Sequence, residues 1–167
     1  MLYLLELAVV FLNKTLSGFF HCSLSLLTVH VVRVNSTVAF RGDTEFLKNN
    51  IRVKADLDAL GDAGWYSIRA ILWTADYELP QTVTALRDPV LNEDGVILSC
   101  GATLSWKDGR VATFNCSFVT NMATDIFASG TKGNLRVHDF VIPFLENVAP
   151  FYTEEGSSFG ELATSIH

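Results

Sequence analysis

Two runs of alternating side chains flank a short turn, and this pattern constrains the fold more than any other feature of the chain. Residues 95–106 and 110–119 lie on either side of Lys107-Asp108-Gly109, and Gly109 suits the left-handed position of a three-residue hairpin loop. If Trp106 pairs with Arg110, the pairs below them on that face are all apolar: Leu104 with Ala112, Ala102 with Phe114, Cys100 with Cys116 and Leu98 with Phe118. A slip of one residue would mix the two faces, so we predict an antiparallel hairpin in this register.

The other face of this hairpin is polar, because it pairs Thr103 with Thr113, Gly101 with Asn115 and Ser99 with Ser117. The apolar face of the hairpin is therefore expected to be buried in a core, and the polar face to contact solvent or a partner. The register also brings Cys100 and Cys116 close enough to cross-link, although two reduced core thiols are the expected state in a cytosolic protein.

Four other segments have the pattern of strands. A strand is predicted over residues 31–40, because one face is mainly apolar and alternates with a more polar one: Val32, Val34, Ser36, Val38 and Phe40 alternate with Arg33, Asn35, Thr37, Ala39 and Arg41. Residues 81–88 lie between two prolines, and residues 123–129 and 134–141 form a second hairpin through Gly130-Thr-Lys-Gly133. One strand, then a helix, then a meander predicts an α+β fold: an open, mainly antiparallel sheet with helix cover on one face.

The helix in this arrangement is predicted to run from about Asp62 to about Ala75. Asp62 is a favoured N-cap residue. The residues after it have apolar side chains at spacings of three and four, which places them on one stripe: Trp65, Ile68, Ile71, Leu72 and Ala75. The stretch between residue 41 and Leu60 is a mixed, charged connection, and its Arg52, Lys54 and Asp56 are interpreted as solvated loop residues.

The start of this helix is the candidate site. Gly61 and Gly64 allow the backbone to approach another surface closely, and the free N–H groups of a helix start favour negative charge. Tyr66 lies in the first turn, where a phenol can donate a proton to a developing alkoxide or accept one from an alcohol if its pKa is lowered, usually by a lysine. The alternative is that Trp65 and Tyr66 are aromatic residues that pack the helix start.

Composition excludes several function classes. The chain has 167 residues, enough for one domain, and it is 49% hydrophobic and 18% charged. A net charge of −6 without a basic stripe disfavours nucleic-acid binding. The three cysteines, which include Cys22, and the early histidines His21 and His30 lack metal-ligand spacing, so no metal site is predicted and a reducing, cytoplasmic location is expected.

The first part of the chain allows an alternative location. Residues 1–12 are apolar apart from Glu6, and residues 15–32 contain no charged side chain if histidine is neutral. No positive side chain precedes the first apolar run, which disfavours a signal peptide, and scattered serine, threonine and histidine residues dilute the second run. Membrane association through residues 1–32 is therefore the less favoured alternative to a cytoplasmic protein.

Three motifs, in this order along the chain, carry a family resemblance: Leu60-Gly-Asp-Ala-Gly-Trp-Tyr66, Gly109-Arg-Val-Ala-Thr-Phe114 and Gly130-Thr-Lys-Gly-Asn-Leu-Arg-Val137. They resemble the C-terminal domain of the Gfo/Idh/MocA oxidoreductases, over roughly residues 29–143. The resemblance divides the chain into an apolar segment at residues 1–28, the domain at residues 29–145, and a polar tail at residues 146–167 that is an incomplete end of the domain.

The resemblance implies a division of labour. In that family a Rossmann domain holds NAD or NADP, and the C-terminal domain supplies the substrate site and the sheet used for oligomerisation. Hydride passes between the nicotinamide and a sugar, polyol or diol. In members with Asp-x-Gly-x-Tyr, the tyrosine is the acid/base and the aspartate supports it, so these roles fall on Tyr66 and Asp62. Gly61, Gly64 and the adjacent Trp65 would lie at the approach to substrate and cofactor.

Two departures from the family pattern shape the functional prediction. None of the eleven glycines forms Gly-x-Gly-x-x-Gly after a strand, and no segment resembles the Glu-Lys-Pro whose lysine assists the tyrosine. We therefore predict a truncated oxidoreductase that binds no cofactor stably and is inactive alone. Two alternatives remain open: an assembly module that pairs through its sheet with a second copy or a full-length homologue, and a membrane-anchored derivative.

Overall fold

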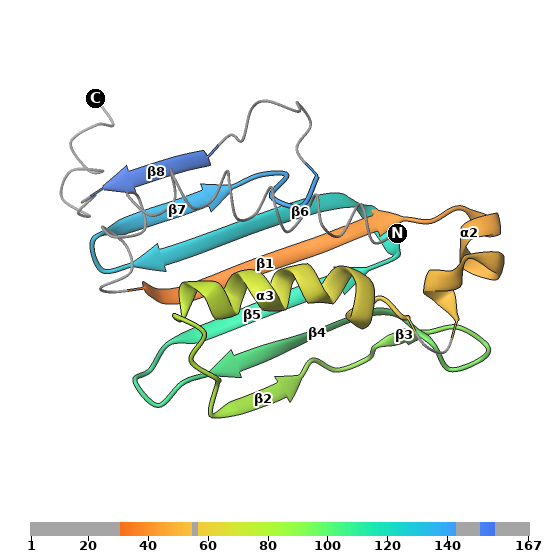
Figure 1. Cartoon of the computed structure of the whole chain (residues 1–167), viewed down its shortest axis with the longest axis horizontal. Helices are drawn as coiled ribbons and strands as arrows, with labels where there is room; N and C mark the ends of the chain where they lie inside the picture. The colour runs from red at the N-terminus through yellow and green to blue at the C-terminus, as the bar shows by residue number, and fades with distance from the viewer. Residues whose placement is uncertain (1–30, 55–56, 143–150, 156–167) are drawn as a thin grey trace, which may run out of the picture.

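An open sheet forms the body of the molecule. The computed structural model describes residues 31–54, 57–142 and 151–155, and this part of the chain forms an eight-stranded sheet (Figure 1). The strand order is β2-β4-β5-β1-β6-β7-β8, with β3 paired to β4, and all pairs are antiparallel except β1 with β5. The strands are β1 (Val31–Arg41), β2 (Thr82–Ala85), β3 (Val90–Leu91), β4 (Ile97–Ser105), β5 (Val111–Ser117), β6 (Val119–Gly130), β7 (Gly133–Val137) and β8 (Phe151–Glu155). The predicted α+β fold is confirmed.

The hairpin of β4 and β5 has the predicted register. Cys100 pairs with Cys116 and Gly101 with Asn115. At the turn, Trp106 N–H donates to Arg110 O at 3.0 Å, and at the open end Phe118 N–H donates to Leu98 O at 2.8 Å. The apolar face is buried at all but Cys100, which is partly exposed. Gly109 has φ +91°, as a turn of this kind requires.

Strand β1 lies at the centre of the sheet, a position that its own sequence does not reveal. It pairs parallel with β5 and antiparallel with β6. The prediction that Val32 belongs to the apolar face is wrong, because the register shifts between Val31 and Arg33: Val31 turns inward, and Val32 is 45% exposed. The inward positions Val34, Ser36 and Val38 follow the predicted alternation.

One long helix covers part of the sheet. Helix α3 (Trp65–Thr74) lies across β1 and β5 on one face (Figure 1). Its buried side chains are Ser67, Ile71 and Thr74, so the predicted stripe is wrong at Trp65, which is 49% exposed. The helix start approaches the sheet so closely that a small side chain is needed there: Ser36 Oγ of β1 donates to Ser67 Oγ at 2.9 Å in the buried contact.

The charged connection before this helix contains structure that the sequence pattern did not predict. Helix α2 (Thr44–Asn49) begins after Asp43, whose side chain accepts from Phe46 N–H at 2.7 Å. Phe46 packs edge-on against Phe40 and Phe118, with ring centroids 5.4 Å apart in each pair. A 3₁₀ turn (Ile51–Val53) follows.

The sheet also extends beyond the predicted strands. Strand β8 pairs with β7, for example at Arg136 with Tyr152, inside the segment for which the sequence predicted only a polar tail. Strand β3 was not predicted either, and β7 ends at Val137, before the predicted residue 141. The predicted segment 1–28 lies outside the described residues. Within the described ranges, no helix has the length and apolar character to cross a membrane.

Candidate functional site

The helix start is wound more widely than an ordinary α-helix. Residues 60–64 (Leu60–Gly64) form a π-helical turn, in which Gly64 N–H donates to Ala59 O at 2.9 Å. Ala59 N–H in turn donates to Ile97 O of β4 at 2.9 Å. The turn that carries the candidate residues is therefore tied directly to the sheet.

Asp58 stabilises the first turn, and the prediction that Asp62 is the N-cap is wrong. Asp58 Oδ1 accepts from Gly61 N–H at 2.7 Å, and Asp58 O accepts from Asp62 N–H at 2.9 Å. Asp62 thus lies inside the helical segment. Its carboxylate is free for a different partner.

That partner is Arg52. Arg52 Nε lies 2.9 Å from Asp62 Oδ2, and the two side chains are 38% and 22% exposed. Asn50 Oδ1 accepts from Arg52 N–H at 3.0 Å, and the adjacent Val53 is buried, so the 3₁₀ turn holds Arg52 in place. The interpretation of Arg52 as a solvated loop residue is wrong, and no local pattern signals the contact, because it depends on how two separate segments pack.

Tyr66 lies one helical turn after Asp62 and is partly buried. Burial raises the pKa of Tyr66, the Asp62 carboxylate raises it further, and Arg52 partly opposes both effects. The chemistry of a base requires a lowered pKa, and the surroundings of Tyr66 in this chain have the opposite effect. The phenol is therefore protonated at neutral pH, a state that suits proton donation.

Burial also raises the pKa of Asp62, and the charge and hydrogen bond of Arg52 act against this effect. The Asp62 carboxylate is therefore partly buried and forms an ion pair with the Arg52 guanidinium. Arg52, Asp62 and Tyr66 together form what we call the helix-start triad.

The two glycines of the motif have different surroundings. A Cβ atom at the buried Gly64 would lie 3.0 Å from Leu60 Cδ1 and 3.3 Å from Cys116 Sγ, so the close approach predicted for this residue is to the sheet. Gly61 is exposed, and its Cβ would make only ordinary contacts. Trp65 is exposed, with the Arg69 guanidinium 5.9 Å from the centre of its ring.

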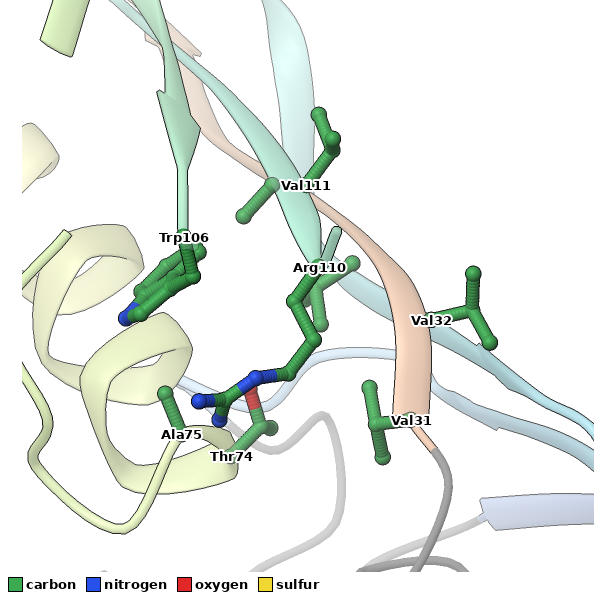
Figure 2. Close-up of a pocket in the computed structure, with 9 residues that line it drawn as sticks. Val31, Val32, Thr74, Ala75, Trp106, Arg110 and Val111 are labelled. Carbon is green, nitrogen blue, oxygen red and sulfur yellow. The ribbon is translucent and has the colours of Figure 1, made fainter. Parts of the chain in front are cut away.

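Two hollows among the described residues are relevant to the site, and no residue of the helix-start triad lines either of them. One lies at the other end of α3, between Thr74, Trp106 and Val31 (Figure 2), and its volume of about 10 Å³ is room for one water molecule. The second is a shallow hollow of about 370 Å³ on the opposite face of the sheet, lined by Asn35, Thr37, Asp125, Phe127 and Arg136. The triad residues are partly exposed, with the side chains of Arg52 and Asp62 at 38% and 22%.

Comparison with known proteins identifies the family. Residues 28–136 match the model of the GFO/IDH/MocA C-terminal domain. The chain belongs to the Gfo/Idh/MocA oxidoreductase family. The match contains the helix-start motif, the hairpin of β4 and β5, and the second hairpin up to Arg136.

Solved structures of Gfo/Idh/MocA oxidoreductases share the fold. Aldose-aldose oxidoreductase from Caulobacter crescentus, complexed with glycerol, is 21% identical, covers 80% of the chain and has a TM-score of 0.63. The WlbA dehydrogenase from Chromobacterium violaceum, in complex with NADH and UDP-GlcNAcA, is 17% identical, covers 90% and has a TM-score of 0.66. The 3-ketoreductase KijD10 from Actinomadura kijaniata, in complex with NADP and TDP-benzene, is 16% identical, covers 75% and has a TM-score of 0.56. This chain spans 39%, 44% and 41% of their respective lengths.

Proposed function

We propose that this chain supplies the substrate side of an NAD(P)-dependent oxidoreductase site for a sugar, polyol or diol. The observation that carries the proposal is the helix-start triad. The partly buried phenol of Tyr66 lies one helical turn after Asp62, and Asp62 Oδ2 lies 2.9 Å from Arg52 Nε. Family membership supplies the reaction class, and the triad supplies the residues that would perform the proton transfer.

In this proposal Tyr66 donates its proton to the oxygen of a carbonyl substrate as that oxygen becomes an alkoxide. Its raised pKa keeps the proton on the phenol until the oxygen becomes strongly basic. Asp62 and Arg52 fix the local charge beside the phenol. In the direction of alcohol oxidation, a positive group contributed from outside the described residues would have to lower the pKa of Tyr66.

The described residues do not fit a dinucleotide. A cofactor-binding glycine leaves room for the ligand, but the Cβ position of Gly64 points at Leu60 and at Cys116 of the sheet. A nicotinamide would supply or accept the hydride, and in this proposal it is held by residues outside this part of the chain. We accordingly expect the 167-residue chain to be inactive alone.

The proposal can be tested by titrating the labelled chain with aldoses, polyols and a vicinal diol while amide chemical shifts are recorded. We expect shifts concentrated at Gly64, Trp65 and Tyr66, and their loss in Tyr66→Phe. Tyr152→Phe on β8 is the matched control, since Tyr152 is exposed and distant in the sheet order. Shifts that persist in Tyr66→Phe, or that occur only on the opposite face, contradict the proposal.

Cofactor binding has its own readout in the fluorescence of NADH and NADPH. We expect the chain alone to leave this fluorescence unchanged, because the described residues offer no cradle for the dinucleotide. Saturable enhancement would show that the chain binds the cofactor itself and would overturn the proposed division of labour.

A second candidate function is assembly through the sheet, with a second copy or a full-length homologue as partner. It is favoured by the hollow on the face of the sheet opposite α3, where Asp125 and the exposed Arg136 lie close enough to line one site. A two-fold arrangement could pair Arg136 of one copy with Asp125 of the other. Sedimentation should show a larger species that Arg136→Glu dissociates, while Arg69→Glu on α3 leaves it intact. A monomer at all concentrations, with or without the homologue, would contradict this role.

We further propose that the protein works in the cytoplasm. A carbonate wash of membranes tests this location, because a protein without a membrane anchor leaves the pellet. Retention in the pellet would instead support anchoring through residues 1–32.

A further inference from the structure

Two cysteines lie side by side beneath the helix start. Cys100 and Cys116 are directly opposite one another on β4 and β5, and their Sγ atoms are 3.5 Å apart. We propose that they form a reversible disulfide, which changes the packing under the turn Leu60–Gly64. This inference concerns a redox modification site and goes beyond the proposed function.

The backbone geometry allows the bond. Leu98 and Phe118 form a hydrogen-bonded pair of the antiparallel ladder, because Phe118 N–H donates to Leu98 O. Such pairs recur every second residue, so Cys100 and Cys116, the pair two positions nearer the turn, are also a hydrogen-bonded pair. Such pairs have Cα atoms about 5.5 Å apart, which lies within the range of disulfides. The sulfur atoms must close from 3.5 Å to about 2 Å, a movement within reach of side-chain rotation and a small backbone adjustment.

The two thiols differ in access, which sets the order of events. Cys100 is partly exposed and Cys116 is fully buried. The Cys100 thiolate attacks a small disulfide oxidant, which forms a mixed disulfide and releases one thiol. The Cys116 thiolate then attacks the Cys100 sulfur and releases the second thiol, so two protein thiols are oxidised as one disulfide is reduced. Burial raises the pKa of both cysteines, so this exchange is slow at neutral pH.

The consequence lies in the contact with the turn. Cys116 Sγ is the atom that a Cβ at Gly64 would meet at 3.3 Å, so this sulfur supports the turn from below. Bond formation draws it toward Cys100 and removes the S–H group that now donates to Cys100 O at 3.5 Å. The turn carries Asp62, and any effect on catalysis through Asp62 rests on the proposed function.

The experiment uses the full chain in a Cys22→Ser background, which leaves only this pair of thiols. The reduced protein is incubated with oxidised glutathione, an acyclic disulfide, and intact mass and amide hydrogen exchange are then measured. We expect the loss of two hydrogens, reversal by dithiothreitol, and exchange at residues 60–65 that is several-fold faster in the oxidised protein. Exchange in β6 and β7 should be unchanged.

Single-cysteine variants test the order of attack with oxidised glutathione. Cys116→Ser should retain a glutathione adduct on the partly exposed Cys100, and Cys100→Ser should react much more slowly. Two results overturn the inference: an unoxidised pair after prolonged treatment with excess oxidant, or a disulfide that leaves exchange at residues 60–65 unchanged. Neither readout depends on substrate or activity, so failure here leaves the proposed function to its own test.

Discussion

The two faces of the sheet differ in composition and in what covers them. The covered face carries buried apolar side chains such as Leu104, Phe114 and Phe118, and α3 packs across it. The open face carries Asn35, Thr37, Asp125, Phe127 and Arg136 around a shallow hollow. The same strands build both faces, since alternate residues point in opposite directions.

This difference separates two kinds of function. The covered face fixes the helix start against β4 and β5, which positions the helix-start triad at its rim. The open face has polar groups without that tight packing, and it is the face that we propose for assembly. We therefore expect substitutions to have large effects under the helix, intermediate effects at the turn, and small effects on the open face.

The largest effect is expected for Phe118→Ala. Phe118 is fully buried and packs against the rings of Phe40 and Phe46, so the substitution leaves a large cavity. We expect a loss of about 3–5 kcal/mol in the free energy of unfolding, measured by urea denaturation. Phe127→Ala on the open face is the matched control and should cost clearly less. Equal losses would mean that the two faces are packed alike.

At the turn, Gly64→Ala should destabilise the chain by about 1–3 kcal/mol, because the added methyl group meets Leu60 and Cys116. Gly61→Ala, three residues earlier in the same turn, should change stability by no more than about 0.5 kcal/mol, because its Cβ meets nothing closer than 3.5 Å. Thermal denaturation of the two variants makes the comparison. A larger loss of thermal stability for Gly61→Ala than for Gly64→Ala would show that Gly64 does not lie tightly against the sheet.

The charge at the triad gives a smaller, pH-dependent effect. Burial raises the pKa of Asp62 above its value in the unfolded chain, so its contribution to stability is fully present at low pH and declines as the pH rises through the folded-state pKa. The amide introduced by Asp62→Asn cannot ionise. This variant should therefore gain stability relative to the wild type between acidic and neutral pH, as followed by urea denaturation across that range. The reverse trend would show that the ion pair with Arg52 outweighs burial.

The smallest effect is expected on the open face at the Asp125–His138 pair. The two side chains lie 2.7 Å apart but are 37% and 36% exposed. Since exposed pairs contribute little, His138→Ala should lower the free energy of unfolding by less than about 1 kcal/mol. Chemical denaturation of the monomeric protein is the measurement, and a loss as large as that of Gly64→Ala would contradict the contrast between the faces.

The sequence revealed those features that depend on local pattern. The register of β4 with β5 follows from alternation on two adjacent segments, and only one pairing keeps Leu98, Ala102 and Phe114 on the same face. A helical segment near Asp62 is predictable because the motif and the apolar spacing lie together, although the sequence did not predict the π-helical turn before Trp65. In such cases the information is contained within a few neighbouring residues.

Other features depend on contacts between distant segments, which periodicity does not encode. The pairing of β1 with β5 and the ion pair between Arg52 and Asp62 belong to this class. Ser67 lies on the buried side of α3 because Ser36 is opposite it on β1, and neither serine looks like a core residue by itself. The motif therefore indicated Tyr66 and Asp62 but gave no sign of Arg52.

The most direct test of the account joins residues 29–155 to the part of the NADP-bound 3-ketoreductase KijD10 from Actinomadura kijaniata that lies outside its match with this chain. Reduction of bound NADP is then followed by absorbance with a panel of aldoses, polyols and diols. We predict that the chimera reduces NADP with at least one of them, and that Tyr66→Phe lowers the rate by about 100-fold or more. A folded chimera that binds NADP but reduces none of it, or that works equally well with Tyr66→Phe, would contradict the claim that this chain carries the substrate side of the site.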